Sequence, residues 1–344
     1  MWRGILEFIE TLFELLWFNL VVLGISFYIL FKSADFFVES AVGISKYYNL
    51  PKMLVGIIIV GFGTTAPEIA VSAIASFRGH PEIAFGNAIG SVIVDDGVAL
   101  ALAGIISSVP ILVDRRILKM AGLFLVGIDS VAFLLALNGR FSRIEGAILI
   151  VLLFGYLGMV YGAEKKRRLG LIGIDIEIMR SEVKSIKKIF IIFFIALGGV
   201  LFSSRLVVRT SVFLASYLGL SEAIIGLTVV AIGTSLPEIS TCIVSARKRH
   251  GEIAIGDIVG ADILNILWII GVSSLIKPIN IDLITVVTSF GFMFLVVGVM
   301  LISMRVKYRL TRLNGIFLLL IYGIYIAFNY FLYVKKGFIL IGGQ

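Results

Sequence analysis

Two six-residue segments of this chain, 170 positions apart, carry nearly the same set of oxygen-bearing residues. Residues 63–68 read Gly-Thr-Thr-Ala-Pro-Glu, and residues 233–238 read Gly-Thr-Ser-Leu-Pro-Glu. Each segment lies within a hydrophobic stretch long enough to cross a bilayer, where a glutamate costs roughly 3 kcal/mol and usually marks a functional site. Because the same cost occurs at matched positions, Glu68 and Glu238 are predicted to belong to one shared binding site.

The residues around each glutamate are of the types that bind a hard cation. Pro67 has no N–H and so frees the Gly63 carbonyl, which is tolerated at membrane depth only inside protein or beside a watery cavity. Thr64 and Thr65 add hydroxyls, and Glu68 is expected one helical turn beyond Thr64 on the same face. Such oxygens suit Ca²⁺, which takes six to eight of them, and also Na⁺. The second segment repeats the set with Gly233, Thr234, Ser235 and Glu238.

The next hydrophobic stretch after each segment adds a second pair of polar residues. Ser91 and Asp95 are four positions apart and share a helical face, and their counterparts in the second copy are Ala261 and Asn265. Together with the two glutamates, Asp95 gives a site of formal charge up to −3. Like charges this close cannot all stay ionised without a cation, so cation and proton binding should compete. Four glycines in these stretches should let helices approach closely: Gly86, Gly90, Gly256 and Gly260.

These residues require a membrane-spanning helical scaffold. Of the 344 residues, 59% are hydrophobic and only 15% charged, and the mean hydropathy is +1.08, whereas soluble domains are about a quarter charged. Windows of about 20 residues predict ten spans and an all-α polytopic membrane protein. The predicted spans are 18–45, 53–77, 82–107, 116–137, 142–162, 188–216, 222–246, 252–276, 283–304 and 313–334.

The net charge of +8 could suggest nucleic-acid binding, but the positions of the basic residues argue against it. With the N-terminus outside, the odd-numbered loops hold 20 Lys and Arg, while the even-numbered loops and both tails hold seven. This is the positive-inside pattern, so both termini are predicted to lie on the outer side of the cell membrane. Residues 1–17 alternate aromatic and aliphatic residues with acids, which predicts an interfacial helix. The single cysteine, Cys242, excludes an intrachain disulfide.

The two segments belong to a longer internal repeat. At the same offset, residues 56–95 and 226–265 share 14 identities in 40 positions. The two halves are residues 18–162 and 188–344, each with five predicted spans, and a charged cytoplasmic linker over 163–187 joins them. Because five is odd, the second half should cross the membrane in the opposite orientation. An inverted repeat of this kind is a frequent plan of secondary transporters, whose binding site lies near the bilayer midplane.

These residues resemble the sodium/calcium exchanger branch of the calcium/cation antiporter superfamily. The two segments look like its paired alpha-repeats, whose usual form is G-T-S-x-P-E followed by G-N-x-x-G-S-N-I-x-N. Ten spans, an outside N-terminus and a cytoplasmic loop between the repeats also match. The resemblance implies exchange of three Na⁺ for one Ca²⁺ by alternating access, with spans one and six sliding past a fixed core. It implies neither an enzyme nor a bound cofactor.

The resemblance also implies roles for ten residues of this chain. The central carboxylates shared by Ca²⁺ and Na⁺ would be Glu68 and Glu238. The central site would be completed by Asp95 and Asn265 and by the backbone carbonyls of Thr64 and Thr234. The flanking Na⁺ sites would be formed with Thr65, Ser91, Ser235 and the backbone carbonyl of Ala231. Because Ala261 lacks the hydroxyl present at Ser91, the ion stoichiometry stays open.

Other interpretations remain at this stage. Asp96 and Asp262 could be further ligands or proton carriers, which would support proton-coupled exchange of Ca²⁺ or another divalent cation. A channel would share the oxygen-lined site without coupling, and an intramembrane enzyme is disfavoured because no nucleophile motif or metal cluster is present. Asp129, alone in the middle of its span, is interpreted as a neutral or hydrogen-bonded packing residue. Membrane lipid is expected around the chain, and nothing predicts a nucleic-acid or protein partner.

Charged residues also occur within the first and sixth predicted spans. At the repeat offset, Asp35 matches Arg205 and Glu39 matches Arg209. Inverted symmetry does not by itself make these pairs neighbours in space. Their long side chains could reach the membrane interface in a structural role, or ion pairs among them could gate moving helices.

Overall fold

The computed structural model describes residues 15–169, 185–218 and 231–341, with side chains described over 15–164, 185–218 and 232–331. Most of the predicted interfacial helix and linker, and the beginning of the predicted 222–246 span, lie outside these ranges. Within them, eight helices are long and apolar enough to cross a membrane, and a bent pair gives a ninth. The all-helical membrane fold is therefore confirmed, while the count of ten spans stays a prediction.

The helices of the first half correspond to its five predicted spans, some of them interrupted. Its elements are α2 (Leu16–Tyr48), α3 (Lys52–Val55), the π-helix η1 (Gly56–Val60), α4 (Gly61–Thr64), α5 (Ala66–Phe77), α6 (Pro81–Val94), the π-helix η2 (Asp95–Leu100), α7 (Ala101–Ile106), β1 (Ile111–Leu112), α8 (Arg115–Ala136), β2 (Arg140–Phe141) and α9 (Arg143–Leu169). The segments α3 to α5 form one bent span, and α6 to α7 form one continuous span.

The second half repeats this order of elements. Its described elements are α11 (Ile186–Tyr217), α13 (Ala231–Thr234), α14 (Leu236–Arg247), α15 (Gly251–Leu264), the π-helix η4 (Asn265–Ile270), α16 (Gly271–Ile276), β3 (Ile279–Asn280), α17 (Leu283–Arg305), β4 (Arg309–Leu310) and α18 (Arg312–Ile341). From α5 to α7 and from α14 to α16, the boundaries match at the 170-residue offset. Strand β1 pairs antiparallel with β4, and β2 with β3, so each ladder joins the two halves. The inverted orientation of the halves stays a prediction.

Local sequence signals account for where the helices begin. The Asp114 carboxylate caps α8 by accepting hydrogen bonds from the backbone N–H groups of Arg116 and Ile117, at 2.8 and 3.0 Å. Asp282 caps α17 in the same way through the N–H of Thr285, at 2.9 Å. Prolines occupy the first or second position of α5, α6 and α14, where a missing N–H has no helical acceptor to lose.

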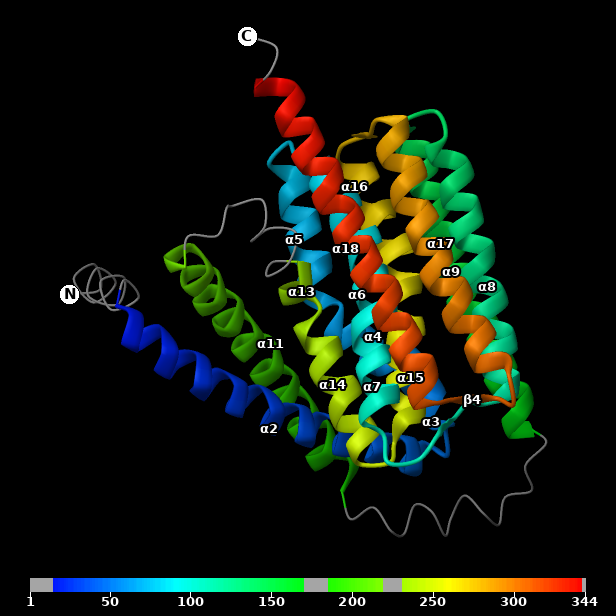
Figure 1. Ribbon diagram of the computed structural model, residues 1–344. Coiled ribbons are helices and arrows are strands. Elements are labelled where there is room, and N and C mark those ends of the chain that lie inside the picture. The colour runs from blue at the N-terminus through cyan, green and yellow to red at the C-terminus, as the bar shows by residue number, and fades with distance from the viewer. Residues whose placement is uncertain (1–14, 170–184, 219–230, 342–344) are drawn as a thin grey trace.

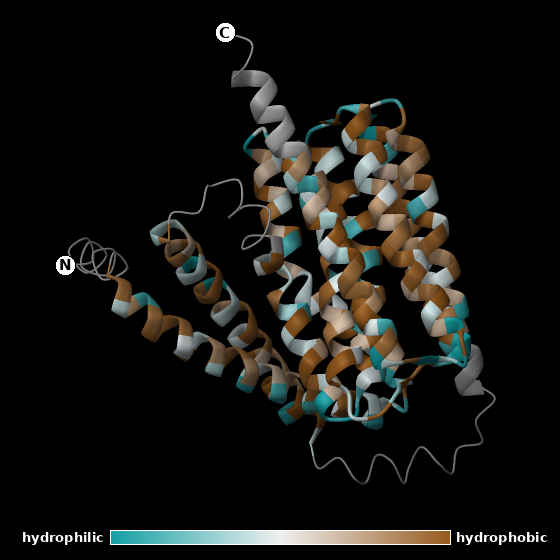
Figure 2. Cartoon of the chain, in the orientation of Figure 1, coloured by the Kyte–Doolittle hydropathy of each residue, from teal (hydrophilic) through white to brown (hydrophobic). Residues whose placement is uncertain are grey.

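The helices form a bundle with one slanted pair on its flank (Figure 1). Helices α2 and α11 pack along each other, and α2 also packs against α14. The span from Gly251 to Ile276 is the most enclosed, with 94% of its most apolar window buried, whereas the corresponding value for α18 is 17%. Hydrophobic residues cover the helices, and hydrophilic residues concentrate at helix ends and turns (Figure 2). The two most buried of these spans, Gly251–Ile276 and Pro81–Ile106, carry Asn265 and Asp95.

Glycines bring the first half directly against α15. A Cβ added at Gly56 would lie 2.6 Å from the Ile253 carbonyl oxygen and 2.8 Å from the Gly256 Cα. A Cβ at Gly260 would collide with the backbone of Ile57. The predicted close approach is confirmed for Gly256 and Gly260. At the matched Gly86 and Gly90, the described residues place no atom within 4 Å of an added Cβ.

Candidate cation-binding site

The first Gly-Thr-x-x-Pro-Glu segment interrupts its helix. Helix α4 ends at Thr64, α5 begins at Ala66, and the two axes are bent by 44°. Thr65 lies at the bend, and Pro67 is the second residue of α5, where its ring and missing N–H stop α4 from continuing. Glu68 lies in the first turn of α5, where the helix dipole favours a carboxylate. Glu68 and Thr64 therefore lie on two helices across a bend, and not on one continuous helical face as expected.

The second segment has the same local structure. Helix α13 ends at Thr234, Ser235 lies between the helices, and α14 begins at Leu236 with Pro237 as its second residue. Glu238 lies in the first turn of α14. Both glutamates are therefore presented by a helix N-terminus next to a chain break, as the repeated sequence requires.

Two π-helices begin at the matched polar residues of the following spans. Asp95 is the first residue of η2, and Asn265 is the first residue of η4. A π-helix within an α-helix is rare, is energetically unfavourable in isolation and often lies at a functional site. The sequence analysis did not predict these π-helices, because no residue pattern distinguishes them from ordinary helix. They mark Asp95 and Asn265 as a structurally matched pair.

The three predicted carboxylates converge from three different spans. Glu68 interacts electrostatically with Glu238 and Asp95, and Asp95 interacts with Glu238. Each of the three side chains is only 1% exposed. A buried carboxylate is costly unless it is paired, protonated or bound to a cation. The geometry therefore brings Glu68, Glu238 and Asp95 into one buried acidic cluster.

Hydroxyl groups connect this cluster across the two halves. The Thr64 and Thr65 hydroxyls, from the first half, lie beside the Glu238 carboxylate of the second half. Ser235, from the second half, lies beside Asp95 of the first. Although they lie beside carboxylates, the Thr65 and Ser235 hydroxyls have no partner in good hydrogen-bonding geometry among the described residues. They remain available as ligands within the acidic cluster.

Several other oxygen atoms in the site are buried without a hydrogen-bond partner among the described residues. They include both carboxylate oxygens of Glu68, Oδ1 of Asp95, Oε2 of Glu238, the Ser91 hydroxyl and the side-chain amide of Asn265. Leaving one such group unpaired costs about 1–3 kcal/mol, and more for a charged group, so folded proteins rarely tolerate several together. The donor set of carboxylate, hydroxyl and amide oxygens fits Ca²⁺ or Na⁺.

Asp257 is a fourth carboxylate of the site that the sequence analysis missed. Its Oδ1 accepts a hydrogen bond from the Thr64 hydroxyl at 2.9 Å, and its side chain is fully buried. Asp257 also interacts electrostatically with Glu68 and Glu238. Its counterpart Asn87 donates to the Ser72 hydroxyl at 3.0 Å and to the Glu68 carbonyl at 3.4 Å. The replacement of Asn87 by an acid at the repeat offset was the signal that could have identified Asp257.

A second group of acids lies next to the central one. Asp96, Asp129 and Asp262 are completely buried, and none of their carboxylate oxygens has a hydrogen bond to a described residue. Asp262 interacts electrostatically with Asp96 and Asp129, and also with Asp95 and Asp257 of the central cluster. The hydrogen-bonded interpretation of Asp129 is therefore not supported. The two acidic groups form one connected set of buried carboxylates.

Two of the predicted ligands, Thr234 and Ala231, lie on the short helix α13. Thr234 is half-buried at the end of this helix. Ala231 begins α13, but its side chain lies outside the described residues. In the described part of the chain, no three His, Cys, Asp or Glu side chains are placed to hold a metal ion by themselves. A cation here would therefore need hydroxyl and backbone oxygens in addition to carboxylates.

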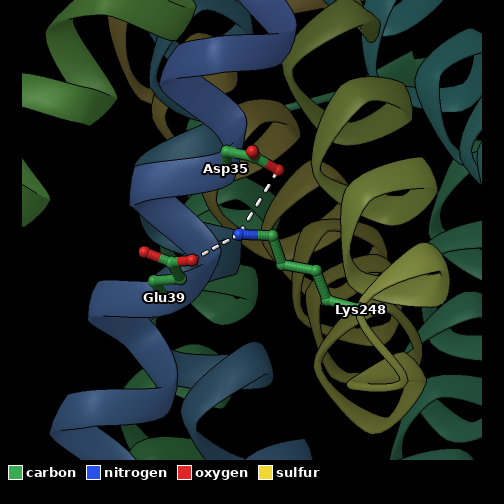
Figure 3. A network of polar contacts seen from close by, with 3 residues as sticks. All are labelled: Asp35, Glu39 and Lys248. Carbon is green, nitrogen blue, oxygen red and sulfur yellow. Dashed lines mark hydrogen bonds and ion pairs between the residues drawn. The ribbon is translucent and has the colours of Figure 1, made fainter.

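The charged residues of α2 have a different partner from the one suggested by the repeat offset. The Lys248 ammonium, at the end of α14, lies 2.6 Å from Glu39 Oε1 and 3.4 Å from Asp35 Oδ1 (Figure 3). Arg205, the offset counterpart of Asp35, is exposed on α11. These ion pairs connect α2 to α14, which also carries Glu238.

Known proteins share this architecture and sequence. The sodium/calcium exchanger protein family matches residues 18–162 and 188–331. The sodium/calcium exchanger MaX1 of Methanosarcina acetivorans is 26% identical over 340 residues, covering 89% of this chain and 96% of MaX1. The inner membrane protein YrbG of Escherichia coli is 32% identical over 270 residues, covering 77% of this chain and 82% of YrbG.

A solved structure agrees with these sequence relationships. The sodium-calcium exchanger NCX_Mj, soaked with 100 mM Na⁺ and 10 mM Sr²⁺, superimposes with a TM-score of 0.77 at 28% identity. The match covers 91% of this chain and 99% of that chain. The matched regions include both Gly-Thr-x-x-Pro-Glu segments and the spans that follow them. This chain belongs to the sodium/calcium exchanger protein family.

Proposed function

We propose that this protein is a secondary active antiporter that exchanges Na⁺ for Ca²⁺ across the cell membrane by alternating access. The observation that carries the proposal is the convergence of Glu68, Glu238 and Asp95 from both halves of the chain into one buried cluster. Family membership and the likeness to an exchanger of solved structure support the same function. No covalent chemistry and no bound cofactor are part of the proposal.

In this proposal, Ca²⁺ binds between the two broken helices. Glu68 and Glu238 supply the central carboxylates, and the backbone carbonyls of Thr64 and Thr234 join them beside the chain breaks. Asp95 and Asn265 complete the central site from the π-helices. Six to eight oxygen ligands at about 2.3–2.6 Å satisfy Ca²⁺, and this set can supply that number without a further metal-binding group.

The same carboxylates serve Na⁺ in the other half of the cycle. Thr65, Ser91 and Ser235 contribute hydroxyls to the flanking Na⁺ sites, and Ala231 contributes its carbonyl. If three Na⁺ replace one Ca²⁺, one net charge crosses the membrane in each cycle, which is worth about 2.3 kcal/mol per 100 mV. Ala261 cannot supply the hydroxyl that Ser91 supplies, so the second half offers one side-chain ligand fewer for Na⁺.

In the proposed alternating-access cycle, the slanted pair of helices moves relative to the rest of the bundle. Helices α2 and α11 pack mainly along each other, while the site residues lie on helices of the enclosed bundle. Movement of α2 and α11 as a unit would open the site to one side of the membrane and then the other. The positive-inside pattern places the linker in the cytoplasm and both termini outside.

Calcium flux in proteoliposomes tests the coupling ion. Vesicles containing the full chain are loaded with Na⁺ and diluted into Na⁺-free medium that contains radioactive Ca²⁺. The proposal predicts Ca²⁺ uptake that follows the outward Na⁺ gradient and is unchanged when a protonophore collapses any pH gradient. Uptake that stops with the pH gradient and ignores Na⁺ would refute Na⁺ coupling. Uptake that needs no internal cation at all would indicate a channel.

Proton-coupled exchange of Ca²⁺ or another divalent cation is the second candidate. The connected acids Asp96, Asp129 and Asp262 favour it, because they lie beside the central cluster without an opposite charge or hydrogen-bond donor in the described structure. The proteoliposome experiment separates the two candidates, since an imposed pH gradient alone would then drive Ca²⁺ uptake.

A further inference from the structure

A groove lies on the outside of the bundle, and none of the buried carboxylates lines it. It has a volume of about 500 Å³ and is formed by one face of α8 and one face of α17. The α8 residues that line it recur at intervals of three and four, as expected for a single helical face: Arg115, Leu118, Lys119, Gly122, Leu123 and Val126. The α17 side follows the same spacing with Gly298, Leu301, Ile302 and Arg305.

Positive charge is confined to one end of this groove. Arg115 and Lys119 lie in the first turns of α8, and Arg305 is the last residue of α17, beside the β1–β4 ladder (Figure 1). All three side chains are exposed. No acidic side chain lines the groove, and no salt bridge between described residues involves any of the three. The basic end is therefore electrostatically uncompensated.

Tyr308 orients one of these cations. The Arg115 guanidinium lies 5.2 Å from the centroid of the Tyr308 ring, a cation–π contact. The backbone holds Tyr308 in place, because its carbonyl accepts a hydrogen bond from the Val113 N–H at 3.0 Å. The Arg115 side chain is exposed, so its N–H donors can also reach an anion at the surface. A planar fork of this kind suits phosphate oxygens.

The remainder of the groove is lined by apolar residues. An added Cβ at Gly298 would meet no atom within 4 Å, whereas one at Gly122 would lie 3.0 Å from the Leu301 side chain. Leu123 and Ile302, on the rims, are 66% and 67% exposed, as expected for side chains that face lipid. From Arg115 to Val126 the helix rises about 16 Å, close to the roughly 15 Å of one hydrocarbon leaflet.

We propose that this groove binds an anionic phospholipid, with the headgroup phosphate held by Arg115, Lys119 and Arg305 and one acyl chain lying over Gly122 and Gly298. Basic pockets between membrane helices bind anionic lipid headgroups. A second copy of this chain fits less well, because a two-fold contact would place the same cations against each other. This proposal holds whether Na⁺ or H⁺ drives exchange.

Lipid binding to the purified full chain tests the proposal. Dioleoyl phosphatidylglycerol bound to the chain in neutral detergent is counted by native mass spectrometry, with dioleoyl phosphatidylcholine for comparison. The double variant Arg115→Gln/Arg305→Gln should reduce phosphatidylglycerol binding at least tenfold. The control Arg116→Gln/Lys307→Gln removes two neighbouring charges outside the groove and should reduce it less than threefold. Equal losses in the two variants would overturn the proposal, since surface charge alone would then explain binding.

Two further measurements distinguish a bound lipid from a soluble anion and from a second copy of the chain. Gly298→Leu fills the apolar groove without changing its charge, and it should also reduce phosphatidylglycerol binding at least tenfold. Glycerol phosphate, which has the headgroup chemistry without acyl chains, should not compete at millimolar concentration. Effective competition by glycerol phosphate would overturn the assignment in favour of a soluble anion. The lipid assignment would also be overturned if Gly298→Leu left phosphatidylglycerol binding unchanged and converted a wild-type dimer into a monomer in light scattering. The groove would then bind a second copy of the chain.

Discussion

The hydrogen bond from Thr64 to Asp257 permits a quantitative prediction about how the two halves hold together. The bond is 2.9 Å long and joins α4 of the first half to α15 of the second, and both side chains are completely buried. Thr64→Val replaces the hydroxyl by a methyl group of similar size and removes the donor. The other Asp257 oxygen already lacks a described partner, so the carboxylate would lose its side-chain hydrogen bond.

The expected loss of stability follows from the burial of the acceptor. A hydrogen bond contributes about 0.5–1.5 kcal/mol, and leaving a buried polar group unpaired costs about 1–3 kcal/mol. Thr64→Val should therefore lower the free energy of unfolding by about 1–3 kcal/mol. Thr64→Ser, which keeps the donor, should lower it by less than about 1 kcal/mol. Both values are measured by denaturant unfolding in mixed micelles without Ca²⁺.

A double-mutant cycle isolates the interaction itself. Combining Thr64→Val with Asp257→Asn should give a coupling energy of about 1–3 kcal/mol, because the second change removes the carboxyl group that the first leaves unpaired. Ca²⁺ transport should survive Thr64→Val, since the proposed Ca²⁺ ligand is the backbone carbonyl, which valine retains. A coupling energy below about 0.5 kcal/mol, or a Thr64→Val protein as stable as Thr64→Ser, would refute the reasoning.

Three further predictions concern packing, ion pairs and pH. Gly260→Ala forces a methyl group into the Ile57 backbone and should destabilise the protein by about 1–3 kcal/mol in thermal unfolding, whereas Gly291→Ala, which meets no atom within 4 Å, should be neutral or stabilising. Lys248→Gln removes ion pairs in which the lysine side chain is 25% exposed. Because solvent screens such pairs, the free energy of unfolding should fall by at most about 1 kcal/mol. Transport rates should change by less than about fivefold. His250 lies 3.1 Å from the Lys52 ammonium, and partial burial, with Lys52 as the next cause, lowers the pKa of His250. As the pH falls below about 6.5, the unfolded chain therefore binds more protons than the folded chain, so the free energy of unfolding decreases. His250→Gln should make this decrease smaller. A larger transport effect at Lys248, or an identical pH profile for His250→Gln, would contradict these assignments.

Much of the fold could be predicted because the bilayer restricts what the chain can do. Hydrophobic length alone located the spans, including the bent α3 to α5 pair and the enclosed span from Gly251 to Ile276. The repeated Pro67 and Pro237 located both helix breaks, since proline cannot continue a helix there. The ion partners of α2 could not be predicted, because Lys248 comes close to Asp35 only through tertiary packing.

The candidate site was predictable to the extent that its residues are repeated. Glu68, Glu238 and Asp95 were identified from matched motifs, and the structure brings them together. Asp257 was missed because its place in the site comes from tertiary packing against Thr64, and the change from Asn87 to an acid at the repeat offset was its one sequence signal. The π-helices at Asp95 and Asn265 were missed because one additional residue in a helical turn leaves no compositional signal.

The central claim is that Glu68 and Glu238 together form one site used by both ions. The most direct test is Na⁺-gradient-driven Ca²⁺ uptake in proteoliposomes containing Glu68→Gln or Glu238→Gln, with each variant shown to be folded by its elution profile. Glutamine keeps the size of each side chain and removes the charge that Ca²⁺ requires. The account predicts that uptake falls to the level of empty vesicles in both variants. Uptake at the wild-type rate in both would contradict it.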